Sequence, residues 1–237
     1  MMKISPYKKI AIVFLLSCAT SANAATLLHS YQFQGNLNDS LGGIALIADG
    51  GTLGSSSYSF DKNQGLTLSN GLTAGDSYSI ALNFNFTTLN GWQKIVDFKD
   101  LVPDSGFYTL DNYLNFYPVA NGSTPLTVNT NADVVITRDS SSNVFTAYLN
   151  GVQELTFTDS SSLAVFNSAN NIMHFFEDDA ATSHSEAAPG VVNSIRIWDG
   201  ALSANEVANI SAVPVPAAIW LFGSGLGLLS FTCRKKS

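Results

Sequence analysis

The 237-residue sequence has only two cysteines, and neither lies in its central part. Cys18 and Cys233 both lie in apolar end segments, so residues 25–212 contain no thiol. A disulfide, a cysteine-ligated zinc site and a cysteine nucleophile are therefore excluded from this part of the chain. Its stability must come from packing, to which a bound ion would add.

Basic residues are also scarce between residues 25 and 212. This part contains five basic residues and all 18 acidic residues of the chain, so its net charge is −13. The five are Lys62, Lys94, Lys99, Arg138 and Arg196. An acidic surface of this kind repels phosphate backbones, so nucleic acid is excluded as a partner. Calcium or a cationic environment suits it better.

The first 24 residues have the three parts of a secretory signal peptide. Three lysines precede an apolar run from Ile10 to Leu16, and the small residues Ala22 and Ala24 follow. This order predicts cleavage before Ala25. Two alternatives stay open. One is an N-terminal membrane anchor, for which the apolar run is far shorter than the ~20 residues needed to span; the other is a lipobox "LLSC" with a lipidated Cys18.

Residues 213–237 combine a long uncharged run with a basic end. The 21 residues from Val213 to Cys233 are uncharged, which is long enough for one transmembrane helix. Because positive residues stay in the cytoplasm, the tail from Arg234 to Lys236 places the preceding domain outside the membrane.

This segment resembles the PEP-CTERM sorting signal of Gram-negative bacteria, which the membrane protease exosortase reads. The residues that carry the resemblance are Val213, Pro214, Pro216, Ala217, Ala218, Trp220, Leu221, Gly223, Gly225, Arg234, Lys235 and Lys236. It implies processing by exosortase, transient anchoring in the inner membrane and release to the cell surface or medium. Val215 departs from the pattern, because many members have glutamate there. A permanent single-pass anchor is the alternative.

The central part, residues 25–212, alternates apolar and polar residues with period two. In "SYSIALNFNF" Tyr78, Ile80, Leu82, Phe84 and Phe86 share one face, which predicts a strand with one buried and one wet face. Further strands are predicted at 27–33, 65–68, 94–98, 107–110, 113–117, 133–138, 144–149, 152–158, 172–176 and 191–198. So many short strands predict an all-β, antiparallel sandwich.

Two local signals add detail to this fold. Asn150-Gly151 lies between two predicted strands and is typical of a tight hairpin turn. Ser203 and Glu206 form a capping box, which predicts a short helix over Ser203–Ile210 that closes the domain.

Three stretches resemble the concanavalin A-like jelly rolls of the laminin G type. They are "HSYQFQGNLNDSLGG", "DVVITRDSSSNVFTAYLNGVQ" and "VVNSIRIWDGALSANEV", in the family's order. The resemblance brackets about 180 residues and implies a jelly roll over residues 25–212. It also implies a structural calcium ion held by Asn36 and Asp39 in the first loop. The chain departs from the family at Gln34, at Asn131-Ala132 and at Asn193-Ser194.

Nothing in the sequence assigns a catalytic residue. A glycan hydrolase on this fold needs closely spaced carboxylates along one strand, whereas the four glutamates are scattered. No Gly-x-Ser-x-Gly elbow occurs, and no histidine has a second histidine at i+4. A glycan hydrolase or lyase is therefore disfavoured.

Two kinds of residue suggest binding instead. Asp178 and Asp179 lie in the acidic loop "FEDDAATSHSEAAPG", which offers oxygens for calcium if it folds back. Trp92 and Trp198, with Tyr108, Tyr113 and Tyr117, offer rings for stacking on a sugar. The sequence thus predicts a secreted matrix or surface protein that binds or scaffolds exopolysaccharide. A calcium-dependent, lectin-like module is the alternative within binding functions.

Overall fold

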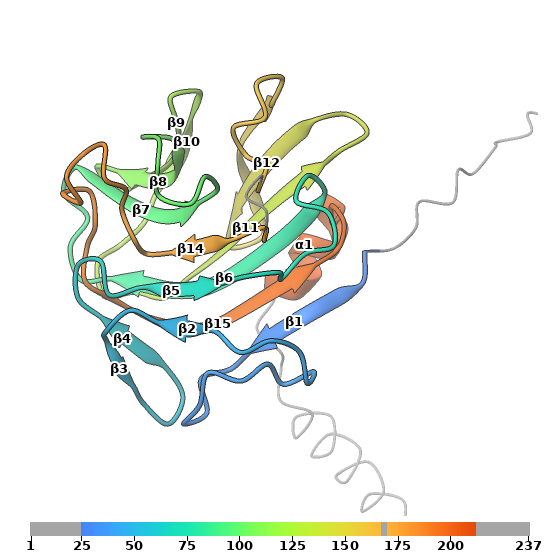
Figure 1. The fold of residues 1–237 in the computed structure, drawn as a ribbon. Coiled ribbons are helices and arrows are strands. Elements are labelled where there is room, and N and C mark those ends of the chain that lie inside the picture. Colours follow the sequence, from blue (N-terminus) through green and yellow to red (C-terminus); the bar gives the residue numbers. More distant parts are fainter. Residues whose placement is uncertain (1–24, 167–169, 212–237) are drawn as a thin grey trace, which may run out of the picture.

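The computed structural model describes residues 25–166 and 170–211. They form two antiparallel β-sheets packed as layers, with one short helix beside them, as the sequence predicts (Figure 1). Within this described part, no helix is long and apolar enough to cross a membrane. The predicted signal peptide and sorting segment, residues 1–24 and 213–237, lie outside the described residues.

Sheet A is the eight-stranded layer. Its order is β13 (Val152–Thr158), β12 (Val144–Leu149), β11 (Ala132–Asp139), β6 (Tyr78–Phe86), β15 (Gly190–Trp198), β4 (Tyr58–Phe60) and β3 (Thr52–Leu53). β1 (Leu27–Tyr31) pairs with the C-terminal half of β15, and β4 pairs with its N-terminal half. The long strands β6, β11 and β15 therefore form the centre of this sheet.

Sheet B is the seven-stranded layer. Its order is β10 (Ala120–Pro125), β9 (Tyr113–Tyr117), β8 (Gly106–Leu110), β7 (Trp92–Asp97), β14 (Met173–Phe175), β5 (Leu66–Leu68) and β2 (Ile47–Ala48). All the strands predicted from the sequence are present in the two sheets, with ends that agree to within about two residues.

Aromatic residues fill the space between the sheets. The five residues of β6 predicted to share a face are all buried in this core, as alternation requires. Phe176 stacks on Phe60 with ring centroids 4.5 Å apart, and Phe116 meets Phe145 at 4.8 Å. Each buried ring contributes about 1.5–3 kcal/mol, so the sandwich is stable without a disulfide.

The helix α1 (Ala204–Ser211) covers part of the outer face of sheet A. The capping box is present: the backbone N–H of Ser203 donates to Glu206 Oε2 at 2.7 Å. Val207 is buried against Trp198, Leu202 and Ala81 in a second small core. The prediction of a wet outer face on β6 is therefore wrong at Ser79 and Ala81: Ala81 packs in this second core, and Ser79 Oγ bonds to the backbone of Gly200 and Leu202 just before the helix.

On one side of the sandwich a carboxylate links the edge strands of the two sheets. Glu154 on β13, the edge strand of sheet A, accepts hydrogen bonds from the backbone N–H groups of Ser123 and Thr124, each at 2.8 Å. Both donors belong to β10, the edge strand of sheet B. These bonds join the edges of the two sheets and lower the pKa of Glu154 below its usual value, because they outweigh the cost of burial.

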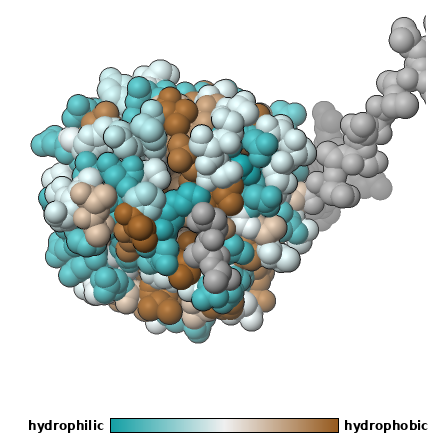
Figure 2. All heavy atoms as spheres, turned by 45° about the horizontal axis from the view of Figure 1, so that its top comes forward, coloured by the Kyte–Doolittle hydropathy of each residue, from teal (hydrophilic) through white to brown (hydrophobic). Residues whose placement is uncertain are grey.

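Exposed apolar residues are dispersed over the surface. Figure 2 shows one face on which brown apolar residues form several small patches between hydrophilic ones. The most exposed large apolar residues of the described part include Val102, Ile47 and Val152. Val102 lies in a loop of sheet B, Ile47 on β2 and Val152 on β13. These exposed residues therefore come from separate parts of the fold.

Candidate functional site

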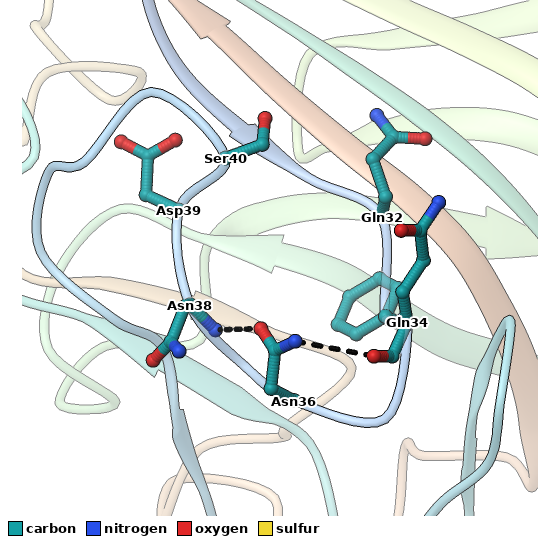
Figure 3. Close-up of a pocket in the computed structure, with 7 residues that line it drawn as sticks. Gln32, Gln34, Asn36, Asn38, Asp39 and Ser40 are labelled. Atoms are coloured by element: carbon teal, nitrogen blue, oxygen red, sulfur yellow. Dashed lines mark hydrogen bonds between the residues drawn. The ribbon is translucent and has the colours of Figure 1, made fainter.

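A polar depression lies between the end of β1 and the first loop. Its volume is about 360 Å³, and its lining residues are Gln32, Phe33, Gln34, Asn36, Asn38, Asp39 and Ser40. Figure 3 shows the glutamines on one side and the residues from Asn36 to Ser40 on the other. Asn36 fixes the turn locally: its amide donates to the carbonyl of Gln34 at 3.1 Å and accepts from the N–H of Asn38 at 2.9 Å.

Asp39 is buried and its carboxylate already has four partners. Oδ1 accepts from the N–H groups of Ser30 and Leu41 at 2.9 and 3.0 Å. Oδ2 accepts from the N–H of Gly43 at 3.1 Å and lies 2.8 Å from His29 Nδ1. A Cβ at Gly43 would lie 2.4 Å from Oδ2, so glycine is needed for this close approach.

These four bonds decide what Asp39 does in this structure. A carboxylate has about four lone-pair positions, and all are used, so Asp39 serves as a structural acceptor that ties the first loop to β1. The bonds also lower its pKa, because together they outweigh the effect of burial. Calcium binding by Asn36 and Asp39 stays a prediction, and an ion would have to displace one of the present donors.

An aromatic slot lies on strands β7 to β10 of sheet B. We use this name for the cavity of about 220 Å³ lined by Trp92, Leu110, Asn115, Tyr117, Pro118, Val119, Ala120 and Asn121. Trp92 stands edge-to-face between Tyr108 and Tyr117, with centroid distances of 5.5 and 5.3 Å. Trp92, Tyr108 and Tyr117, three of the rings that the sequence analysis named, therefore lie together on sheet B, on the face that points away from the main core.

The other proposed stacking residue, Trp198, lies elsewhere. It is only 7% exposed and packs beneath α1 in the second small core. The guanidinium of Arg196 lies 5.6 Å from its ring centroid. Trp198 thus has no free ring face for a sugar, and its prediction as a stacking residue is wrong.

A buried ion cluster lies next to the slot. It consists of Lys94 on β7 and the carboxylates of Asp97, Asp178 and Asp179, all four of them with fully buried side chains. Lys94 Nζ lies 3.2 Å from Asp97 Oδ2 and 3.7 Å from Asp178 Oδ1, and it also donates to Asp179 Oδ2. Its ammonium lies 4.7 Å from the centroid of the Tyr108 ring, so Tyr108 lies between the cluster and Trp92, which lines the slot.

The predicted calcium ligands Asp178 and Asp179 therefore face a lysine. Among residues 25–166 and 170–211, no group of three or more His, Cys, Asp or Glu side chains is arranged to hold a metal ion. The sequence did not single out Lys94, although alternation along β7 puts it on the same face as Trp92. Calcium binding by Asp178 and Asp179 stays a prediction, and the ammonium of Lys94 already lies between their carboxylate oxygens.

Two groups at the margin of the cluster have raised pKa values. Burial and the neighbouring charges of Asp104 and Asp178 raise the pKa of Glu186 to about 7. Burial alone would lower the pKa of His174, but its hydrogen bonds to Glu177 and Asp100, at 2.9 and 3.1 Å, raise it.

These shifts predict a domain that is more stable in mild acid. In the folded state Glu186 holds its proton up to about pH 7, whereas the unfolded chain loses it near pH 4.5, so stability falls as the pH rises between these values. The raised pKa of His174 changes stability in the same direction. Its contribution is complete below about pH 6.5 and is lost as the pH rises above that value. We expect the melting temperature to fall between pH 5 and pH 8.

Glu186→Gln should flatten this dependence and raise the melting temperature at pH 8. Glu206→Gln is the matched control, because hydrogen bonds from Ser203 lower the pKa of Glu206, which then stays ionised over the whole range. A melting temperature that rises from pH 5 to pH 8 in the wild-type protein would contradict the assignment.

Comparison with known proteins identifies the fold. Residues 60–208 match the family model described as the concanavalin A-like lectin/glucanases superfamily, of laminin G type. No curated protein sequence matches the chain. Domain 4 of AbnA, a GH43 extracellular arabinanase from Geobacillus stearothermophilus solved in complex with arabinotriose, superposes with a TM-score of 0.60 and 18% identity. The match covers 80% of this chain and 100% of that domain.

Two larger proteins contain a similar fold. A Trypanosoma rangeli sialidase in complex with sialic acid has a TM-score of 0.59 and 10% identity over 84% of this chain and 35% of its own. Botulinum neurotoxin type C, described as entering cells through two ganglioside molecules, has a TM-score of 0.59 and 12% identity over 78% and 50%. The chain therefore spans only a third to a half of these proteins. By its match over residues 60–208, the present chain belongs to the concanavalin A-like lectin/glucanase superfamily.

Proposed function

We propose that this chain is an exported glycan-binding module whose sugar site is the aromatic slot, and that it binds without catalysing a reaction. The single observation that carries the proposal is a cavity lined by the rings of Trp92 and Tyr117 and by two asparagines, with the buried Tyr108 packed behind Trp92. Sugar rings have apolar C–H faces that pack on aromatic rings, while amides exchange hydrogen bonds with their hydroxyls.

One atom in the slot lacks a partner that a glycan would supply. Asn115 Oδ1 is buried and accepts no hydrogen bond, while the Nδ2 of the same side chain donates to Asn121. Leaving a buried acceptor unpaired costs about 1–3 kcal/mol, which a donor from the ligand would recover. A sugar hydroxyl seated against Trp92 is such a donor once the Asn115 side chain turns Oδ1 toward the cavity.

The charge of the domain narrows the class of glycan. Residues 25–212 have a net charge of −13, so the module repels polyanions. We therefore propose that the ligand is a neutral oligosaccharide or exopolysaccharide and not a uronic-acid polymer. The arabinotriose complex of the arabinanase domain supports a glycan partner by analogy of fold.

The proposed location follows from the end segments. We propose export by the N-terminal signal peptide, transient anchoring in the inner membrane by residues 213–237, and release by exosortase to the cell surface or matrix. An extracellular form that ends near Val213 is the expected product, and peptide mapping of that form checks it. The intact sequence "GLLSFTCRKKS" on the secreted molecule would contradict processing.

Trp92→Ala should weaken glycan binding about tenfold or more, because truncating an aromatic residue at the centre of a site typically costs over 1 kcal/mol. The measurement is a neutral-glycan array followed by calorimetric titration of the best ligand. Tyr113→Ala is the matched control, since Tyr113 is an exposed ring on β9 that does not line the slot.

The same titration separates the rival functions. Equal affinity in calcium and in chelator supports the slot alone, whereas loss of binding in chelator favours the calcium-dependent lectin. Release of new reducing ends from the bound glycan would show a hydrolase. Unchanged affinity of Trp92→Ala would overturn the slot as the site.

A further inference from the structure

Lys94 and Asp179 meet in a site from which water is excluded. Both side chains are fully buried, and Lys94 Nζ donates directly to Asp179 Oδ2. We propose that the two residues form an intramolecular amide, an isopeptide bond between Lys94 Nζ and Asp179 Cγ. This proposal is independent of the glycan-binding function.

Asp179 is arranged as an electrophile. Its second oxygen, Oδ1, accepts hydrogen bonds from the backbone N–H groups of Ala181 at 2.8 Å and Thr182 at 3.4 Å. When Nζ adds to Cγ, negative charge develops on this oxygen, and donors already aimed at it stabilise the tetrahedral intermediate. The backbone of the loop that follows Asp179 thus supplies an oxyanion hole.

Two carboxylates are placed to move the protons of Lys94. Asp97 Oδ2 lies 3.2 Å from Nζ and Asp178 Oδ1 lies 3.7 Å from it. Asp178 Oδ1 is buried and has no hydrogen-bond partner, although Oδ2 of the same group accepts from Thr182 and from the N–H of Glu186. A base must lie within about 3.2 Å of the atom whose proton it takes. Asp97 does, whereas Asp178 Oδ1 has the free lone pair and would have to move about 0.5 Å closer.

The leaving oxygen also has a proton donor beside it. Tyr108 Oη lies 3.5 Å from Asp179 Oδ2 and 3.2 Å from Asp104 Oδ1, so its one proton is shared between these two acceptors. Burial, followed by the charge of Asp179, raises the pKa of Tyr108 far above its usual value, so this hydroxyl keeps its proton and stays a donor.

The reaction balances within the site. An ammonium and a carboxylate become an amide and one water: the N–C bond forms, the bond from Cγ to Oδ2 breaks, and two protons pass from Nζ to Oδ2. Asp97 and Asp178 relay these protons and end unchanged. One positive and one negative charge disappear together, so the net charge of the cluster is the same before and after.

Physical chemistry favours the step in this setting. A buried ion pair pays a large desolvation cost, which the neutral amide avoids. Well-oriented groups reach effective molarities of about 10⁵–10⁸ M, which lowers the barrier to attack of Nζ on Cγ. The product would tie β7, near the centre of sheet B, to the loop that leads into β15 of sheet A, 85 residues further along.

The test is the intact mass of the purified, denatured protein. We expect the wild-type chain to be lighter than its sequence by one water, and Lys94→Arg and Asp179→Ala to have their full sequence masses after the same processing of the ends. Tryptic mapping should give one branched peptide that joins Lys94 to Asp179, with no cleavage after Lys94. Because the decisive mass is that of the wild-type protein, a variant that fails to fold does not affect the result.

A full wild-type mass would overturn the proposal. So would a water loss that persists in Lys94→Arg or maps elsewhere, for example to a cyclic imide at Asp199-Gly200. Hydroxylamine separates these cases, since it opens an imide and leaves an isopeptide bond intact.

Discussion

Arg138→Met is expected to remove about 3–5 kcal/mol of folding free energy, which is a large part of the 5–15 kcal/mol of a typical domain. Arg138 is 1% exposed, and its Nε donates to Asp159 Oδ2 at 2.9 Å. The guanidinium also donates to the carbonyl of Asp76 and to Asn143 Oδ1. The variant leaves Asp159 as a buried charge without its cation, and urea denaturation measures the loss.

A double variant separates the charge from the packing. Arg138→Met with Asp159→Asn should be more stable than Arg138→Met alone, because no uncompensated buried charge remains. Lys62→Ala, an exposed lysine, is the control and should change stability by less than about 0.5 kcal/mol. If Arg138→Met were as mild as this control, the ion pair would not be a main support of the fold.

Asp39→Ala is expected to cost about 3 kcal/mol, because hydrogen bonds to a charged acceptor contribute about 1.5–3 kcal/mol each and the freed donors recover part of this from water. The change removes all four bonds that hold the first loop on β1. Thermal melts of the variant measure the loss.

Asn36→Ala is the matched control for Asp39, because it lines the same depression but bonds only to neighbouring residues. It should melt within a few degrees of the wild-type protein. The same melts, repeated with calcium and with chelator, test the predicted ion: a rise with calcium that Asn36→Ala abolishes would show that it binds here. A mild effect of Asp39→Ala would contradict its role as the central acceptor.

Sequence reasoning predicted the long elements of the fold well. The period-two strand at Tyr78–Phe86, the positive φ angles of Asn150 and Gly151, and the cap at Ser203 are local signals, and local geometry decides them. The short strands β2, β3 and β4 were not predicted, and neither was β10, because "ANGSTP" reads as a turn. β10 pairs with β9, and Glu154, about 30 residues away in the sequence, accepts two of its N–H groups.

The candidate sites were only partly predictable. The acidic loop near Asp178 was recognised, but its cation, Lys94, comes from 84 residues earlier, so no local pattern links the two. Trp92 and Trp198 look alike in sequence, and only the position of α1 decides that one is covered. Long-range contacts thus determine which of the chemically suitable residues are accessible.

The carboxylate of Glu154 has a consequence for the behaviour of the protein at high concentration. Free N–H groups on an edge strand are a template to which a second molecule can add a strand, which is a common start of aggregation. On β10 two of these donors are already bonded within the molecule, and a negative charge lies beside them. Strand addition at this edge would have to break those bonds and bring two acidic domains together. The bonded donors thus protect this edge of sheet B against strand addition by a second copy.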